Sequence, residues 1–135
     1  MKEISLQAID ENLDAVLDFI REQLAPFDYP EEKLGILLIA VEEIFVNISH
    51  YAYNPEVGPA TIQVEFDEDP LAVRIVFFDN GIPYDPLLKA DPDITLDADE
   101  RDIGGLGIFM VKQSMDDVIY EYKDGQNILT LIKIL

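Results

Sequence analysis

Cysteine is absent from this chain of 135 residues, and histidine occurs once, as His50. The lack of cysteine excludes disulfides, thiolate metal sites and cysteine nucleophiles, and a single histidine leaves little for a histidine-based metal site or a Ser-His-Asp triad. The sequence has no run of about 18 or more apolar residues to span a bilayer, and no signal peptide pattern opens it. These absences favour a cytoplasmic protein outside the membrane.

Basic residues are few: 9 lysines and arginines stand against 28 aspartates and glutamates, which gives a net charge of -19. Such a charge repels the phosphates of nucleic acids and anionic membranes, so we expect neither as a partner. It serves solubility and the selection of a basic protein partner equally well. The length, with 49% hydrophobic and 27% charged residues, predicts one globular domain over residues 1–135.

The spacing of apolar residues predicts an α+β fold. Strands are expected at residues 3–8, 61–66, 71–78, 118–122 and 127–134, and helices at 13–24, 30–53 and from the glycines at 104–107 to about 115. Short turns between consecutive strands imply antiparallel pairs with the helices gathered on one side. We therefore predict a two-layer sandwich, with a mixed, mostly antiparallel sheet of about five strands, three helices on one face, and a long loop over residues 80–102.

Three polar side chains share one stripe of the second predicted helix. Glu43, Asn47 and His50 fall within about 60° of each other, and apolar residues flank them. A carboxylate and an amide oxygen one turn apart can take a proton and hold a hard cation. Taken alone, however, the spacing favours an ordinary solvated or internally satisfied helix face.

A second segment, residues 79–86, follows the most apolar predicted strand. There Asp79 can accept a hydrogen bond from an exocyclic amine, and Gly81 allows the backbone to approach a flat ring closely. By its turn chemistry alone the segment is an ordinary Asn-Gly turn. Its length and its repeated Asp-Pro pattern instead favour a binding loop.

Glycines gather immediately before the third predicted helix, at Gly104, Gly105 and Gly107. Free backbone amides and the positive end of a helix converge there, which suits a phosphate group. A single G-x-G turn is equally often only a tight connection. Together, however, the three segments come in the right order for one pocket, with a cation and base, ring recognition and a phosphate cradle behind a lid over about residues 85–103.

The three segments resemble the anti-sigma factor serine kinases of bacteria, within the superfamily of histidine kinase-like ATPases that share the Bergerat ATP-binding fold. The resemblance covers nearly the whole chain. Residues 41–47 with Ala52 and Tyr53 look like the N box, residues 79–86 fit the D-x-G-x-P-[FY]-D-P box, and residues 104–108 continuing to 115–118 look like the final glycine box with its M-D-x-V ending.

The resemblance implies ATP as the nucleotide and Mg²⁺ as the metal. Asn47 would ligate Mg²⁺, Glu43 would be the general base that takes the proton of an attacking serine, and Asp79 would read the adenine amino group. Further nucleotide contacts would come from Gly81, Tyr84, Gly104, Gly105, Leu106, Gly107 and Thr130.

Two positions depart from the family pattern. Tyr51 stands four residues after Asn47, where some members carry a histidine, so His50 receives no family role. Ile103 stands where members carry an arginine near the terminal phosphate, which leaves Arg101 and Lys112 as the candidate replacements.

The implied activity is transfer of the γ-phosphate of ATP to a serine of a protein antagonist, with a sigma factor as a further partner. The resemblance also implies a homodimer formed through the first strand and helix. An alternative is a nucleotide-dependent switch that grips its partner and transfers nothing. A detached catalytic piece of a two-component histidine kinase fits less well, because no phosphoacceptor helix pair precedes the pocket.

Overall fold

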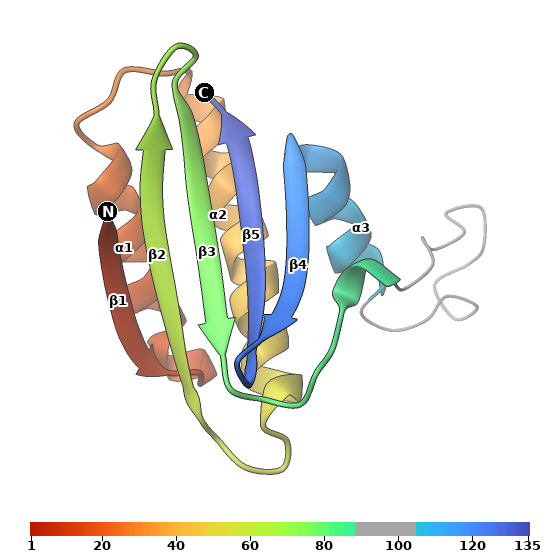
Figure 1. Ribbon diagram of the computed structural model, residues 1–135. Coiled ribbons are helices and arrows are strands. Elements are labelled where there is room, and N and C mark those ends of the chain that lie inside the picture. The colour runs from red at the N-terminus through yellow and green to blue at the C-terminus, as the bar shows by residue number, and fades with distance from the viewer. Residues whose placement is uncertain (89–104) are drawn as a thin grey trace.

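A computed structural model describes residues 1–88 and 105–135, with Gly105 and Leu106 described by their backbone alone. Its strands form a 5-stranded sheet in the order β1-β2-β3-β5-β4. They are β1 (Lys2–Gln7), β2 (Pro59–Asp67), β3 (Ala72–Asp79), β4 (Asp117–Lys123) and β5 (Gln126–Ile134). The helices α1 (Leu13–Leu24), α2 (Glu31–Asn47) and α3 (Gly105–Ser114) lie on one face of this sheet (Figure 1).

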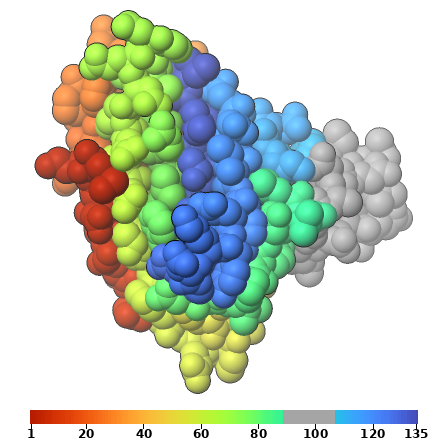
Figure 2. Space-filling view, viewed as in Figure 1, coloured from red at the N-terminus to blue at the C-terminus, as the bar shows by residue number. Residues whose placement is uncertain are grey.

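The predicted two-layer α+β sandwich is confirmed, and each neighbouring pair of described strands is antiparallel rather than mixed. Strands β3 and β4 do run in the same direction, but β5 lies between them and pairs with both. The tight hairpin between β4 and β5 turns at Asp124 and Gly125, whose φ angles of 54° and 78° match the type I′ turn that suits a two-residue connection. In the space-filling view, side chains of the strands themselves form the surface opposite the helices (Figure 2).

The core lies between the sheet and the helices, and strand alternation decides which side chains reach it. In β5, Asn127, Leu129 and Leu131 are buried on the helix side, whereas Ile128 and Thr130 between them are only partly buried. Successive residues of a strand point to opposite faces, so the second set faces away from the helices. The strand side chains that lie between the sheet and the helices therefore come from alternate residues of each strand.

Helix α2 is the central helix and continues into a π-helical turn, η2 (Ile48–Ala52). The combined segment Glu31–Ala52 has 22 residues and a hydropathy of 1.5, which is long and apolar enough, by length and composition only, to cross a membrane. This corrects the expectation that no segment meets these criteria. The fold offers another reason for the apolar composition, because Leu37, Val41 and Phe45 are fully buried and α2 contacts both α1 and α3.

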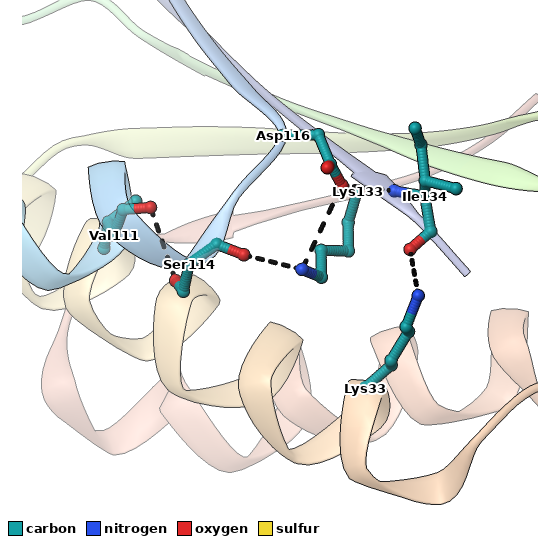
Figure 3. A network of polar contacts seen from close by, with 6 residues as sticks. All are labelled: Lys33, Val111, Ser114, Asp116, Lys133 and Ile134. Atoms are coloured by element: carbon teal, nitrogen blue, oxygen red, sulfur yellow. Dashed lines mark hydrogen bonds and ion pairs between the residues drawn. The ribbon is translucent and has the colours of Figure 1, made fainter.

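Polar contacts tie the C-terminal end of α3 to β5 (Figure 3). The Nζ of Lys133 donates to the carbonyl oxygen of Ser114 at 2.8 Å and lies 4.0 Å from Oδ2 of Asp116. The same Oδ2 accepts from the backbone amide of Ile134 at 2.7 Å. A cation at the C-terminus of a helix complements the negative end of the helix dipole. Helix α3 is thus anchored at the end opposite its glycines.

Candidate functional site

A pocket of about 470 Å³ lies where β3 ends and α2 passes into η2, at the lower end of the sheet in Figure 1. This volume lies within the range of sites for small organic ligands. Its walls carry apolar side chains such as Phe77 and Leu129. The polar side chains Asn47, Asp79 and Asn127 also line it. A mostly apolar cavity with a few polar groups is typical of a site that binds a flat organic ring.

Asp79, the last residue of β3, places a carboxylate in this pocket with an exposed fraction of 6%. Its Oδ1 accepts hydrogen bonds from the backbone amide of Gly81 and from Nδ2 of Asn127, both at 2.9 Å. Its Oδ2 accepts no hydrogen bond from the described residues. Because every fully buried side-chain oxygen among these residues has a partner, Oδ2 is not fully buried. Oδ2 therefore opens into the pocket as a free acceptor for a ligand N–H, which supports the predicted role of Asp79.

Asn127 makes four hydrogen bonds around Asp79. Its Nδ2 donates to Oδ1 of Asp79 at 2.9 Å and to the carbonyl oxygen of Ile82 at 2.8 Å. Its Oδ1 accepts from the backbone amide of Tyr84 at 3.1 Å and from the hydroxyl of Tyr120 at 2.5 Å. With an exposed fraction of 7%, this amide uses its full donor and acceptor capacity inside the protein. It joins β3, the loop after it and β4 into one rigid wall of the pocket.

The strand of Asn127 also carries Thr130, which the resemblance had assigned to adenine. Thr130 is not among the residues that line the pocket, because it lies on the sheet face opposite Leu129 and Asn127. Asn127 was missed, although the alternation of Leu129 and Leu131 extended backwards puts residue 127 on the buried face. The two-residue period of the strand could therefore have identified Asn127 as a residue on the helix side of the sheet.

Gly81 was expected to let the backbone approach a flat ligand ring, but it does not line the pocket. The structure shows that a glycine is required there by a neighbouring backbone group instead. A Cβ at this position would collide with the carbonyl oxygen of Ala52 in η2. The next amide, of Ile82, donates to that same oxygen at 3.1 Å. Gly81 therefore allows the loop after β3 to pack directly on the π-helical turn.

Tyr53 holds the same loop from the other side. Its hydroxyl donates to the carbonyl oxygen of Pro59 at 2.6 Å and accepts from the backbone amide of Asn80 at 2.7 Å. Burial raises the pKa of Tyr53, and the nearby Asp79 carboxylate acts in the same direction. The hydroxyl therefore keeps its proton at neutral pH and continues to donate.

Glu43 and Asn47 lie one turn apart on α2, as predicted, and α3 approaches them. Asn47 lines the pocket, and its side chain makes no hydrogen bond with the described residues. A Cβ on Gly107 of α3 would collide with the carboxylate of Glu43. The structure thus places Glu43 beside Gly107, and Gly107 is a glycine because Glu43 occupies that space. Of these three residues, only Asn47 is among those that line the pocket.

The remaining predicted residues are described in part. Tyr84 lines the pocket with an exposed fraction of 51%, and Gly105 is the first residue of α3. Gly104 and the side chain of Leu106 lie outside the described residues. The first amides of a helix have no intrahelical acceptor and carry the positive end of the dipole, so the start of α3 suits an anion.

Of the two candidate cations for the terminal phosphate, only Lys112 belongs to the part of the chain that the structure describes. Arg101 and Ile103 lie outside the described residues, as does the predicted lid from residue 89 onward. Lys112 is not a lining residue and lies on α3 about 10 Å along the axis from Gly105. Of the predicted lid, the described part forms a short 3-10 helix, η3 (Pro86–Leu88), rather than irregular loop.

His50 points away from the stripe that it shares with Asn47 in the sequence. Its Nε2 lies 2.8 Å from Oδ2 of Asp10, and Ser49 donates to Oδ1 of the same carboxylate at 2.9 Å. The hydrogen bond with His50, and then the one from Ser49, hold the pKa of Asp10 below its usual value. These contacts fasten the π-helical turn to the segment before α1, outside the pocket.

The donor set fits a nucleotide and a phosphate-bridged cation. A free carboxylate oxygen in an apolar pocket suits the amine of a purine ring, and the start of α3 suits phosphate. Within residues 1–88 and 107–135, no group of three or more His, Cys, Asp or Glu side chains could hold a metal. A cation beside Asn47 would thus take most of its ligands from phosphate and water, as Mg²⁺ does.

Comparisons with known proteins agree with this geometry. Residues 6–133 match the family described as histidine kinase-like ATPase domain. The chain is 34% identical over 110 residues to serine-protein kinase RsbW of Listeria monocytogenes, covering 78% of this chain and 68% of that protein. It is 30% identical over 95 residues to serine/threonine-protein kinase BtrW of Bordetella bronchiseptica, covering 70% and 66%. Serine-protein kinase RsbW of Bacillus cereus is 32% identical over 95 residues, covering 67% and 58%.

Proposed function

Since the chain belongs to the histidine kinase-like ATPase domain family, with serine-protein kinases among its relatives, we propose that it transfers the γ-phosphate of ATP to a serine of a partner protein. One observation carries the nucleotide part of this proposal. Asp79 holds an unpaired carboxylate oxygen in a mostly apolar pocket of about 470 Å³ that Asn47 also lines, and Glu43 lies one turn from Asn47 on α2 and beside Gly107 of α3.

The adenine ring lies in the apolar part of the pocket, against the neighbouring side chains of Phe77 and Leu129 on β3 and β5. Its 6-amino group donates to Oδ2 of Asp79, the carboxylate oxygen that faces the pocket and accepts no hydrogen bond from the described residues. Leaving such a group unpaired inside the pocket is unfavourable, which makes the amine a strong determinant of binding. Tyr84 at the mouth covers the ring.

The phosphates lie toward α3 and Asn47. The amides of the first turn of α3, including those of Gly105 and Gly107, hold phosphate oxygens. The Asn47 side-chain oxygen contributes a ligand to Mg²⁺, which when bound neutralises phosphate charge.

Glu43 is the general base of the transfer. Its carboxylate lies one turn from Asn47 and beside Gly107, at the end of the site where the γ-phosphate would lie. As the serine hydroxyl oxygen bonds to the γ-phosphorus, Glu43 takes the hydroxyl proton and ADP leaves with the bridging oxygen. Phosphoryl transfer requires little covalent chemistry from the protein, so the positioning of the reacting groups decides the rate.

The phosphoacceptor is a protein antagonist, and a sigma factor is a second partner. A net charge of -19 supports partners with basic surfaces. Strand β1 lies at one edge of the sheet, with one side of its backbone unpaired by β2. This edge and the neighbouring α1 form the surface of a homodimer.

A switch that binds nucleotide without transfer is the second candidate. It is favoured by one observation, since no lysine or arginine of the described residues lines the pocket. Without a cation at the γ-phosphate, transfer would be slow even where ATP binds well.

Mass spectrometry of purified antagonist proteins after incubation with the full chain, ATP and Mg²⁺ separates the two. The kinase proposal expects a phosphoserine that appears with the wild-type protein and is lost with Glu43→Gln. Calorimetry on both proteins serves as the control, because Glu43→Gln should still bind ATP. Tight ATP binding without any phosphoserine would overturn the kinase and leave the switch.

A further inference from the structure

Two backbone groups determine which way round the Asn127 amide lies. The amide of Tyr84 can only donate and the carbonyl oxygen of Ile82 can only accept, so Oδ1 must face Tyr84 and Nδ2 must face Ile82. Nδ2 therefore presents an N–H, and never a lone pair, to Asp79 at 2.9 Å. The reversed amide would set its oxygen against two acceptors.

The orientation of Asn127 limits what the Asp79 carboxyl group can do. Oδ1 of Asp79 meets two N–H groups, from Gly81 and Asn127, so a proton on this oxygen would face two donors. Rotation of the carboxyl group would break both hydrogen bonds. Oδ2 is therefore the oxygen left for a ligand, and it is presented to the pocket in one orientation.

We propose that Asn127 is a positioning residue that sets the preference of this pocket for 6-aminopurines over 6-oxopurines, by holding Asp79 with Oδ2 as an acceptor. This inference rests on the proposed function, because it takes the purine of ATP to bind against Asp79. The amino group of adenine donates to Oδ2, whereas the carbonyl oxygen of hypoxanthine would face a lone pair there. Without Asn127, the Asp79 carboxylate can rotate and turn Oδ2 away from the 6-position of the ring, so both its attraction to an amine and its repulsion of a carbonyl oxygen weaken.

ATP and ITP provide the test, because they differ at the 6-position of the ring. Calorimetry with Mg²⁺ should show that Asn127→Ala raises the Kd for ATP about tenfold or more and changes the Kd for ITP less than about twofold. The discrimination ratio then falls about tenfold. Equal weakening of both nucleotides would mean that Asn127 only supports the fold, and it would overturn the inference.

Asn127→Asp keeps the shape of the side chain and guards against misfolding of the alanine variant. An ionised carboxylate carries no proton where the amide has two, so it cannot donate to Asp79 or to Ile82. Its ATP-to-ITP ratio should also fall about tenfold. A folded Asn127→Asp protein, checked by circular dichroism, that keeps the wild-type ratio would contradict the inference.

Tyr120→Phe is the matched control. It removes one donor from Oδ1 of Asn127 but leaves Tyr84 and Ile82 to orient the amide, so the ratio should stay within about twofold of wild type. A fall as large as that of Asn127→Ala would overturn the inference. If the wild-type protein binds neither nucleotide, the proposed function fails and this inference with it. If wild type binds ATP and the Asn127 variants keep its ratio, only the inference fails.

Discussion

Replacing Gly107 by alanine tests whether Glu43 acts from the position in which the structure places it. Gly107 lies in the first turn of α3, and a Cβ there would collide with Oε2 of Glu43 and lie 2.9 Å from its Cδ. Ordinary carbon contacts begin at about 3.5 Å, so the carboxylate must move by about 1 Å. The backbone amide of residue 107 is kept.

The expected effects on stability and on rate have opposite signs. The end of the Glu43 side chain is flexible and can move at small cost, while alanine favours a helix over glycine by about 1 kcal/mol. The free energy of unfolding should therefore stay unchanged or rise by up to about 1 kcal/mol. A displacement of about 1 Å in a general base costs about 100-fold in rate, so phosphoryl transfer should fall by that factor.

Urea unfolding and single-turnover phosphorylation of the antagonist serine measure the two quantities. Gly35→Ala is the matched control, since Gly35 lies exposed on α2 with nothing within 4 Å of an added Cβ. It should raise the free energy of unfolding by about 1 kcal/mol and leave the transfer rate unchanged. Full transfer by Gly107→Ala, in a chain that Glu43→Gln inactivates, would refute the reasoning.

Three further changes test other parts of the structure. Asp79→Asn replaces a pure acceptor by an amide, so ATP affinity should fall about tenfold or more by calorimetry, with a much smaller effect on unfolding. Because the pKa of folded Asp10 is below 3.8, its contribution to stability is complete above that pH and is lost as the pH falls through the folded pKa. His50→Ala should return the Asp10 pKa toward 3.8 in an NMR titration and remove that loss at acid pH. Lys133→Met takes the donor from the Ser114 carbonyl, and should lower the free energy of unfolding by about 1–2 kcal/mol in urea.

Periodicity predicted the fold well because each strand and helix buries one face. The alternation over residues 61–66 and the apolar spacing of residues 13–24 correspond to β2 and α1. The positions of Glu43, Asn47 and Asp79 followed from the same rule, since each belongs to an element whose buried face the sequence defines. That Asn47 and Asp79 line the same pocket depends on how the helix packs on the sheet, which no local pattern contains.

The π-helical turn could not be predicted, and it changes the end of the second helix. A count at 3.6 residues per turn through residue 53 assumes an unbroken α-helix, whereas Ile48–Ala52 forms a wider turn. That turn brings the Ala52 carbonyl against Gly81 and turns His50 toward Asp10. The sequence indicated that Gly81 permits a close approach of the backbone, but it did not identify the Ala52 carbonyl as the group that lies against it.

In the proposed arrangement, the adenine and the phosphates of ATP are bound by different means, which leads to a last prediction. At the end proposed for adenine, Asn127 and Gly81 hold the Asp79 carboxylate by hydrogen bonds. At the phosphate end, no lysine or arginine of the described residues lines the pocket, in a chain with a net charge of -19 that repels an anionic ligand. The phosphates should therefore contribute affinity only when Mg²⁺ accompanies them.

Calorimetry with adenosine, and with ATP in Mg²⁺ or in EDTA, tests this division. ATP with Mg²⁺ should bind more tightly than adenosine, and ATP in EDTA should bind no more tightly than adenosine, because uncompensated phosphate charge adds repulsion. Asn47→Ala should remove most of the gain from Mg²⁺ and leave adenosine binding nearly unchanged, since in the proposed arrangement its side chain contacts the metal and not the ring. Tight binding of ATP in EDTA would refute the argument. Loss of that binding in Arg101→Ala would then identify Arg101 as the cation that compensates the phosphates.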